Sequence, residues 1–393
     1  MKADHSKCIL VINGGSSSLK FSLFQALSFK LQLSGTIKHI GSGKSAMKIV
    51  SEEGTIYTND NETCNTVADG AKAVVQWLKD NGHVDRLAAI GHRLVQGGAT
   101  HRFPELITDL VLEELQDFIY LAPNHLPDEI KIIKTFKTAF PDLIQIACYD
   151  TFFHKDLPSY TRNYPLPASY QKRGLIRYGF HGLSYEYIMQ QLQEEDPLTR
   201  KKKIIIAHLG NGASMAAVVG GISVDTTMGL TPAGGLVMGT RSGDLDPGVV
   251  LFLQKEGKLT AEQLDELLNK ESGLKAIAGI SDVQDLLEKE SDDPKAKEAL
   301  AVFCYQASKF IGALAAGMGG LDMLVFTGGI GENAAPVRER ICAGLSFMGI
   351  KINQRSNRAH LEVISAKSGR VKVKVIKTNE ELMIARHTQH IIN

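Results

Sequence analysis

The sequence predicts an α/β fold of two domains, in which mixed sheets are flanked by helices. With 393 residues, the chain is longer than one hydrophobic core usually organises, so two domains with a cleft between them are expected. Three short apolar runs, residues 8–12, 204–207 and 324–326, each end in a glycine-rich polar turn. Such runs are typical of buried strands, and the stretches between them predict helices on the faces of the sheets.

Two further apolar segments, residues 88–94 and 143–148, are also predicted to be strands. Arg93 lies near the end of the first segment, and Asp150 follows the second. Polar side chains at strand ends are the usual place for catalytic groups in α/β folds. Both residues are therefore candidates for a functional site.

Two stretches repeat apolar residues at helical spacing, and each is predicted to turn one face toward a core. They are residues 67–78 and 300–314. A last helix is predicted to begin at Asn379, because Thr378 and Glu381 have the spacing of a capping box.

The charge balance excludes some classes of partner. Lys and Arg number 44 and Asp and Glu number 43, a net charge of +1. So small a charge gives no global field that would attract nucleic acid or an anionic membrane. The amino terminus lacks the apolar core of a signal peptide, and no apolar run approaches the length of a membrane span. We expect a cytoplasmic protein with no nucleic-acid partner and no membrane attachment.

The five cysteines do not predict a disulfide framework or a zinc site. Their number is odd, they are widely separated, and no C-x-x-C pair occurs. They are expected to be reduced and mostly buried thiols.

The three glycine-rich turns predict close approach to phosphate groups. Backbone N–H groups can approach a phosphate only where no Cβ intervenes, which favours glycine after a buried strand. The turns are residues 14–18, followed by Lys20, and residues 210–212 and 328–331. One such turn alone fits an ordinary hairpin equally well, but three favour a nucleotide with several phosphates. None matches the P-loop or the Rossmann fingerprint.

Several long segments together resemble the acetate and propionate kinase family. The most specific are NGGSSSLK from Asn13, HLGNGAS from His208, MGTRSGD from Met238 and GIGEN from Gly329. HRLVQGG, LAPNHLP, YDTFFH, RYGFHG and TNEELMIAR also match, so the resemblance runs in the family's order from Val11 to Arg386. That family belongs to the superfamily of acetate and sugar kinases, heat-shock chaperone ATPases and actin.

The resemblance implies two actin-like (ribonuclease H-like) domains. Residues 1–150 with 382–393 would form the domain on the acyl-substrate side. Residues 151–381 would bind the nucleotide and form the interface of a homodimer. The implied reaction is reversible, in-line transfer of the γ-phosphoryl group of ATP to acetate, giving acetyl phosphate and ADP.

The chemistry of that reaction requires fixed positive charge more than a base. A carboxylate nucleophile, with a pKa of about 4 to 5, is already ionised at neutral pH. The transferring phosphoryl group spreads negative charge over three oxygens, which cations and a metal ion stabilise. Asp150 is accordingly expected to orient the hydration shell of the metal rather than to remove a proton.

The resemblance assigns roles to individual residues. The implied catalytic residues are Arg93, His125, Asp150, His181 and Arg241. Arg93 would also face the acyl carboxylate, in a small pocket lined by Val95, Asn124, Phe180 and Pro232. Core packing explains Val95, Phe180 and Pro232 equally well, and a structural histidine is an open alternative for His125.

The nucleotide and metal sites are implied in the same way. Magnesium, or manganese, would lie at Asn13 and Glu380, although an acid in a first helical turn is also explained by the helix dipole. The implied nucleotide-binding residues are Ser16, Ser18, Lys20, His208, Leu209, Gly210, Asn211, Gly212, Asp282, Val283, Gln284, Gly329, Ile330, Gly331, Glu332 and Asn333.

Two departures from the family pattern keep alternatives open. Asn124 places an amide where the family has leucine, so a propionate or other short-chain fatty acid kinase is an alternative. Gln284 stands where many members carry arginine on the adenine side, which leaves the identity of the phosphoryl donor open.

An ATP-driven binding module of the same fold is a second alternative, but it would not need Arg93, His181 and Arg241. A nicotinamide oxidoreductase is disfavoured because its fingerprint is absent.

Overall fold

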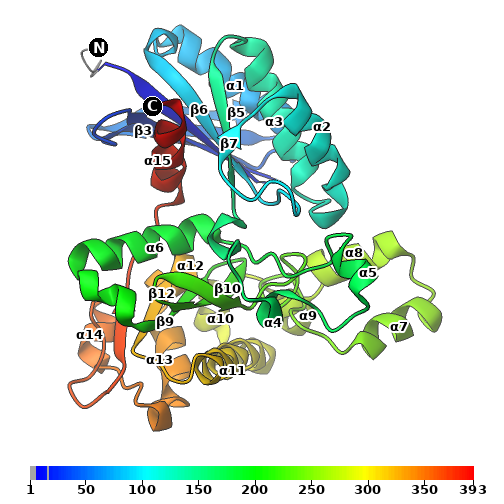
Figure 1. The fold of residues 1–393 in the computed structure, drawn as a ribbon, viewed down its shortest axis with the longest axis vertical. Helices are drawn as coiled ribbons and strands as arrows, with labels where there is room; N and C mark the ends of the chain where they lie inside the picture. Colours follow the sequence, from blue (N-terminus) through cyan, green and yellow to red (C-terminus); the bar gives the residue numbers. More distant parts are fainter. Residues whose placement is uncertain (1–5, 16) are drawn as a thin grey trace. The chain divides into compact units, whose positions relative to one another are not determined.

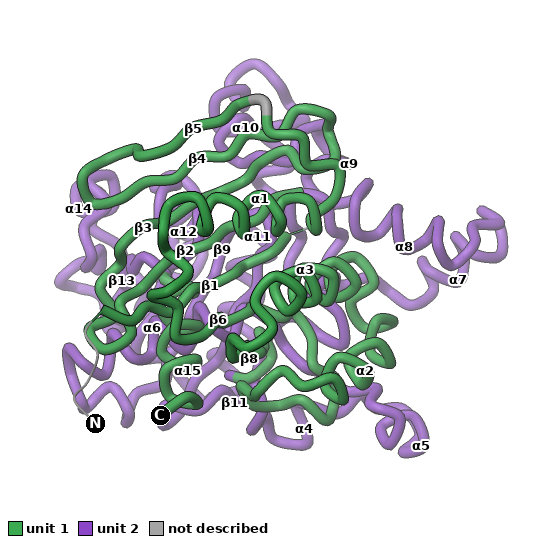
Figure 2. Tube along the Cα trace, turned by 90° about the horizontal axis from the view of Figure 1, so that it is seen from above, with its two compact units in different colours: residues 1–152, 379–393 green, residues 153–378 purple. Residues whose placement is uncertain are grey.

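The computed structural model describes residues 6–15 and 17–393, and the chain divides into two compact units (Figure 1). The first unit comprises Met1–Phe152 and Asn379–Asn393, and the second comprises Phe153–Thr378. Figure 2 shows the two units in different colours. The divisions therefore follow residues 152 and 378, where residues 150 and 381 were expected. Each unit contains a mixed sheet with helices, which confirms the predicted α/β class.

The first unit is built on an eight-stranded sheet with the order β5-β4-β3-β2-β1-β6-β8-β7. The strands are β1 (Cys8–Gly14), β2 (Leu19–Gln25), β3 (Leu31–Lys38), β4 (Ser45–Ser51), β5 (Gly54–Glu62), β6 (Leu87–Leu94), β7 (Glu105–Leu106) and β8 (Ile144–Tyr149). β1 to β5 form an antiparallel meander, whereas β1, β6 and β8 are parallel neighbours. The predicted strands at residues 8–12, 88–94 and 143–148 are confirmed as β1, β6 and β8.

Helices cover both faces of this sheet. They are α1 (Val67–Asp80), α2 (Asp109–Asp117), α3 (Leu126–Ala139) and α15 (Glu380–Ile392), with short 3-10 turns at Val84–Arg86, Ile119–Leu121 and Phe152–His154. Ile90 of β6 lies in the core packed by α1 and α3. At the next residue, Gly91, a Cβ would lie 2.2 Å from Thr388 Oγ1 and 2.6 Å from Ile384 Cγ2 of α15. Because side chains alternate along a strand, α15 covers the opposite face, and glycine allows its close approach.

The second unit is built on a five-stranded sheet with the order β11-β10-β9-β12-β13. Its strands are β9 (Lys203–Leu209), β10 (Ala213–Val219), β11 (Ile222–Thr226), β12 (Met323–Thr327) and β13 (Lys372–Val375). Its helices are α4 (Ser159–Arg162), α5 (Ala168–Gln171), α6 (Gly182–Glu195), α7 (Pro247–Lys255), α8 (Ala261–Lys270), α9 (Gly273–Ala278), α10 (Val283–Lys289), α11 (Pro294–Gly317), α12 (Gly328–Asn333), α13 (Ala335–Ala343) and α14 (Gln354–Arg358), with 3-10 turns at Pro197–Lys201 and Ser346–Met348. β9 and β12 confirm the other two predicted strands.

The two sheets repeat one strand arrangement. β1 pairs antiparallel with β2 and parallel with β6, which is parallel to β8. β9 likewise pairs antiparallel with β10 and parallel with β12, which is parallel to β13. Consequently Gly14, at the end of β1, and the glycine-rich segment 210–212 lie at the ends of corresponding hairpins.

Three expectations about local structure need correction. The cap of α15 is Asn379, whose side chain accepts from Leu382 N, and no Thr378–Glu381 capping box forms. The segment from Gly328 to Asn333 is not an open turn but the short helix α12. By length and composition α11 could cross a membrane, contrary to the expectation from sequence. Its buried residues pack against α9, α10 and α13, as in a core helix.

The helical faces and the cysteines follow the sequence more closely. The predicted face of α1 is buried, and Thr66 caps the helix in a capping box with Asp69. The face of α11 is buried at Leu300, Phe303 and Ala307, while Phe310 is half-buried. All five cysteines are free and buried, as expected.

Candidate functional site

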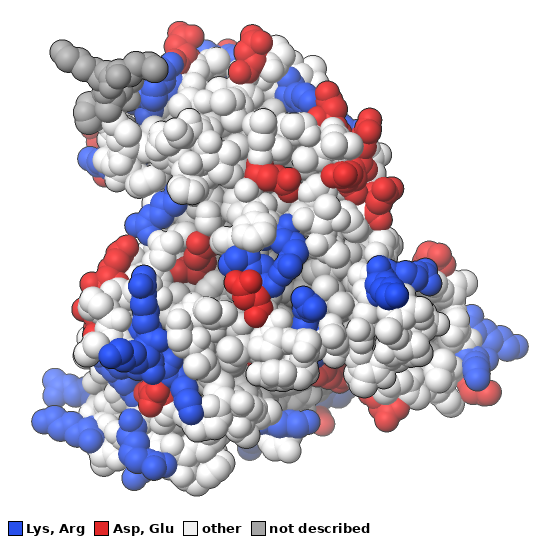
Figure 3. Space-filling model, viewed as in Figure 1, with Lys and Arg blue, Asp and Glu red and all other residues white. Residues whose placement is uncertain are grey.

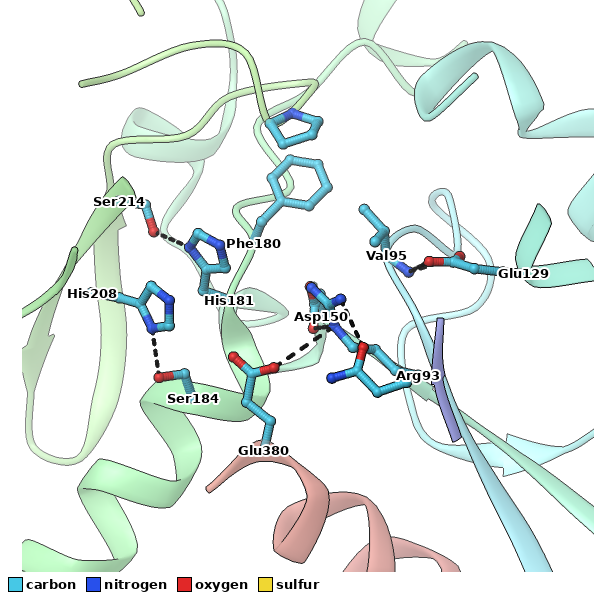
Figure 4. A network of polar contacts seen from close by, with 12 residues as sticks. Arg93, Val95, Glu129, Asp150, Phe180, His181, Ser184, His208, Ser214 and Glu380 are labelled. Carbon is cyan, nitrogen blue, oxygen red and sulfur yellow. Dashed lines mark hydrogen bonds and ion pairs between the residues drawn. The ribbon is translucent and has the colours of Figure 1, made fainter. Parts of the chain in front are cut away.

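An arginine held by carboxylates lies at the carboxyl ends of the parallel strands in the first unit. Arg93 stands near the end of β6, and Asp150 directly follows the neighbouring strand β8. Arg93 donates from Nε to Asp150 Oδ1 at 3.0 Å and from Nη2 to Asp150 Oδ2 (Figure 4). Its Nη1 donates to Asn13 Oδ1 at 3.1 Å. Burial alone would lower the pKa of Arg93, but Asp150 and Glu380 outweigh it and raise the pKa, so the guanidinium stays charged.

The proposed metal-associated residues lie beside this arginine. Glu380, the first residue of α15, has Oε2 4.0 Å from Arg93 Nε. Burial raises the pKa of Glu380 to about 7, against the opposing charge of Arg93. Among the described residues, no group of three or more His, Cys, Asp or Glu side chains is arranged to hold a metal ion by itself. The oxygen donors of Asn13 and Glu380 nevertheless fit magnesium, which keeps several waters and takes phosphate oxygens from a substrate.

A second buried acid, Glu129 of α3, was not identified from sequence. It is 4% exposed, and its two carboxyl oxygens accept from Val95 N at 3.3 and 3.1 Å. Burial raises the pKa of Glu129 to about 8, while the charge of Arg93 lowers it. Glu129 thus fixes the backbone at Val95, a residue of the proposed acyl pocket.

The remaining predicted residues of the first unit precede α3 or lie on the first hairpin. Asn124 and His125 directly precede α3, and His125 occupies its N-cap position without a side-chain cap bond. Ser18 lies in the β1–β2 turn, where its carbonyl accepts from Gly15 N at 2.8 Å. Lys20 pairs across the hairpin with Asn13. Ser16 lies outside the described residues.

In the second unit, two stacked histidines lie near the turn between β9 and β10. The rings of His181 and His208 are 4.2 Å apart and tilted by 21°. His181 Nδ1 bonds Ser214 Oγ at 2.9 Å, and His208 Nδ1 bonds Ser184 Oγ at 2.8 Å (Figure 4). His181 has a φ of 57° at the N-cap position of α6, a backbone conformation that non-glycine residues rarely adopt. Such a conformation, held in place by packing, often marks a functional position.

Arg241 lies close to the same turn. A Cβ on Gly212 would lie 3.4 Å from Arg241 Nη1 and 3.5 Å from His181 Nε2. The absence of a side chain at Gly212 therefore lets a polar backbone lie against both groups. Arg241 Nη1 also donates to the carbonyl of Pro232 at 3.2 Å, so Pro232 holds the guanidinium. Phe180, which precedes His181, is buried.

A pocket of about 510 Å³ brings together many of the residues predicted to bind a nucleotide. Its lining includes eight of them: Gly210, Asn211, Asp282, Val283, Gln284, Gly329, Ile330 and Asn333. Sequence reasoning missed Leu287, Ala334 and Pro336, which add apolar wall. The mixture of apolar walls and glycine backbone suits a flat aromatic base with attached phosphates. Leu209 ends β9 beside this pocket, and Gly331 is buried within α12.

Glu332 and Arg338 hold α12 rather than line the pocket. Glu332 Oε1 accepts from Gly328 N at 2.9 Å and from Thr378 N at 3.1 Å. Arg338 is fully buried and donates to the carbonyls of Gly331 and Glu332 at 2.8 and 2.9 Å. These contacts satisfy backbone groups at both ends of the helix. The arginine was missed because its spacing from the glycine-rich segment carries no signal of a contact.

Comparison with known proteins decides the family. The model of the acetokinase family matches residues 8–386. The chain belongs to this family. Acetate kinases of Methylocella silvestris and Rhodopseudomonas palustris are 40% and 42% identical to it, over 99% and 97% of this chain and 98% of each relative.

Solved structures agree with this assignment. A propionate kinase from Francisella tularensis has a TM-score of 0.92 at 38% identity, covering 98% of this chain and 100% of that chain. An acetate kinase from Porphyromonas gingivalis has a TM-score of 0.88 at 36% identity with the same coverage. The predicted actin-like α/β fold is thereby confirmed, and this member of the acetokinase family is a kinase.

The buried Glu129 predicts a specific dependence of stability on pH. Its pKa is raised from 4.5 to about 8 on folding, so the folded state binds the proton more tightly than the unfolded state. The free energy of unfolding should then fall as pH rises between these values. Glu129→Gln removes this contribution. The variant should therefore gain stability relative to the parent protein as pH rises from about 5 to about 9 in urea unfolding. The exposed Glu298→Gln serves as control; a pH-independent difference for Glu129→Gln would refute the assignment.

Proposed function

We propose that this member of the acetokinase family transfers the γ-phosphoryl group of ATP to acetate, reversibly, giving acetyl phosphate and ADP. The observation that carries the proposal is the charged guanidinium of Arg93, fixed by Asp150 and Asn13 at the ends of β6 and β8. A fixed cation is what a carboxylate substrate and a transferring phosphoryl group both require. Propionate is the second candidate, because Asn124 departs from the family pattern and a structural relative is a propionate kinase.

Each proposed site residue has its own role in the reaction. Arg93 pairs with the acyl carboxylate, and Val95, Asn124, Phe180 and Pro232 contribute the pocket for its alkyl group. Arg241 and His181 donate to the transferring phosphoryl group, with His125 as an additional donor. Bound at Asn13 and Glu380, magnesium or manganese would neutralise phosphate charge.

Asp150 acts as an anchor in this scheme. Both of its oxygens accept from Arg93, so the carboxylate holds the guanidinium in place. The acyl nucleophile needs no base, because it is already ionised. The nucleotide would bind in the pocket beside α12, which Gly210 and Asn211 also line. Ser16, Ser18 and Lys20 remain proposed phosphate-binding residues by the resemblance to the family.

Trapping of acyl phosphate with hydroxylamine tests the substrate assignment. With ATP and magnesium, we expect hydroxamate from acetate and measurable hydroxamate from propionate, because one methylene in an apolar pocket discriminates by only about 1 to 3 kcal/mol. Butyrate and an acid-free reaction complete the series. ATP hydrolysis that no acid stimulates, with no hydroxamate, would instead support the ATP-driven binding module.

Replacement of Arg241 tests the transition-state role. Arg241→Ala should lower kcat by at least about a hundredfold, the scale of losing one fixed donor to developing charge. Binding of ATP should persist, because Arg241 does not line the nucleotide pocket. Calorimetric titration with ATP beside steady-state kinetics checks both statements. The exposed Arg358→Ala is the matched control, and an Arg241 variant with parental kcat would remove the assignment.

We also propose that the protein is a cytoplasmic homodimer that pairs through the second unit. Helices α7 and α8 project from that unit (Figure 2). None of the residues of α7 is buried, although Val249, Leu251 and Phe252 are apolar and 42%, 51% and 63% exposed. Figure 3 shows both basic and acidic side chains on the protein surface. Several exposed apolar side chains on one helix favour an interaction site there.

Sedimentation velocity tests the dimer. The parent protein should sediment as a dimer at micromolar concentration, and Leu251→Asp combined with Phe252→Asp should convert it to a monomer by placing charge in the apolar interface. Leu198→Asp, a change at a 61% exposed leucine elsewhere in the second unit, should leave the dimer intact. A monomeric parent, or a dimer that survives the double change, would reject α7 as the interface.

A further inference from the structure

Thr378 makes two hydrogen bonds that reach different parts of the proposed nucleotide site. Its backbone N–H donates to Glu332 Oε1 of α12 at 3.1 Å. Its hydroxyl donates to Ser184 Oγ of α6 at 2.8 Å. Thr378 is also the last residue of the second unit, two residues before Glu380.

The contact with Glu332 fixes the start of α12. The same oxygen, Oε1, accepts from Gly328 N at 2.9 Å and from the Thr327 hydroxyl at 3.4 Å. Gly328 has a φ of 76°, and a Cβ there would lie 2.7 Å from the carbonyl oxygen of Leu209. One carboxylate oxygen therefore ties the segment before α15 to the helix that carries Gly329 and Ile330 into the pocket.

The hydrogen bond from Thr378 to Ser184 is followed by a second hydrogen bond, from Ser184 to His208. Ser184 Oγ lies 2.8 Å from His208 Nδ1. In the structure the Thr378 hydroxyl donates to Ser184 Oγ, so Ser184 accepts on that side. Ser184 is fully buried, and His208 Nδ1 is the acceptor within hydrogen-bond distance of its hydroxyl among the described residues, so its own proton is directed to His208 Nδ1. This order leaves the proton of a neutral His208 on Nε2.

The protonated nitrogen would face the phosphate turn. His208 Nε2 lies 3.9 Å from the position that a Cβ on Gly210 would occupy. An N–H group at Nε2 can donate to a phosphate oxygen held by the turn at residues 210–212, whereas an unprotonated nitrogen would repel it.

We propose that Thr378 is a positioning residue for phosphoryl transfer. Through Glu332 it holds α12, and through Ser184 it fixes His208 in the Nε2–H tautomer that donates to the nucleotide phosphates. The inference rests on the proposed nucleotide site and extends it to a residue outside the pocket and the three glycine-rich segments.

The tautomer is tested in the protein without ligand by nitrogen-15 NMR of the imidazole groups. The parent protein should show His208 with an acceptor-type Nδ1 and a protonated Nε2, the resonance being assigned by its loss in His208→Gln. Thr378→Val and Ser184→Ala should abolish that pattern, and Thr378→Ser should restore it. An Nδ1–H tautomer in the parent protein, or an unchanged pattern in Thr378→Val, would overturn the relay.

Kinetics separates positioning from general loss of stability. Thr378→Val should raise the KM for ATP about tenfold, the scale of a lost hydrogen bond to a charged group, and Thr378→Ser should recover most of it. Thr199→Val removes another buried threonine hydroxyl of the second unit and should lower stability without changing this KM. Equal effects of the two valine variants would reject the proposal.

Two substitutions test the role of Glu332. Glu332→Gln keeps an oxygen acceptor for Gly328 N and Thr378 N and should stay within about threefold of the parent KM for ATP. Glu332→Met removes the acceptor at similar length and should raise that KM about tenfold. If the glutamine variant raised the KM for ATP as much as the methionine variant, the negative charge of Glu332 itself would serve nucleotide binding.

The NMR measurement of the tautomer needs no substrate. If the expected tautomer were observed but the kinase assay failed, only the proposed function would be rejected.

Discussion

The ion pair between Arg93 and Asp150 fixes the chemistry available to the first unit. Parallel pairing of β6 with β8 places Arg93 opposite Cys148, so Asp150 emerges beside the guanidinium at the same edge of the sheet. Asp150 N also donates to the carbonyl of Leu94 at 2.9 Å, which anchors the backbone that carries the carboxylate. A buried pair costs desolvation of both charges, and it is favourable only where geometry and further hydrogen bonds are good. Here the bidentate contact and Asn13 supply both conditions.

This pair stands among an excess of buried acids. Glu129 and Glu380 both feel the charge of Arg93, and burial raises the pKa of each, to about 8 and about 7. With all three carboxylates ionised, one arginine would face three negative charges, and an anionic substrate would be repelled. Protonation of Glu129 and Glu380, whose pKa values burial raises, reduces the excess near neutral pH. Burial of Glu129 and Glu380 therefore lowers the negative charge around Arg93, which favours binding of an acyl carboxylate there.

The sequence predicted those parts of the site that local patterns encode. Short apolar runs identified β1, β6, β8, β9 and β12, and the strand ends identified Arg93 and Asp150 as candidates. Of the eight predicted residues in the nucleotide pocket, Gly210, Asn211, Gly329 and Ile330 lie in the glycine-rich segments, whereas Asp282, Val283 and Gln284 came only from the resemblance to the family. The meander β3 to β5 was not predicted, because its strands are only partly apolar. Glu129, Ser184 and Arg338 were missed for another reason: their roles arise from contacts across 34, 194 and 7 residues that no short motif records. The cap of α15 was misassigned by one residue because Thr378 uses its hydroxyl for Ser184 instead.

The three glycine-rich segments look alike in sequence but are required for different physical reasons. At Gly14 a Cβ would lie 2.4 Å from Ile132 of α3, so this glycine permits helix packing behind the first hairpin. Gly212 leaves room for Arg241 and His181 beside the second hairpin turn, where close backbone approach has a chemical use. Gly328 adopts a left-handed conformation against Leu209 so that α12 can begin directly after β12. The glycines in these three segments predict that the backbone closely approaches a neighbouring group in each of them. Only the fold determines whether that neighbour is a helix, an arginine or the preceding strand, and for that reason the second turn and α12, rather than Gly14 itself, carry the stronger argument for a phosphate site.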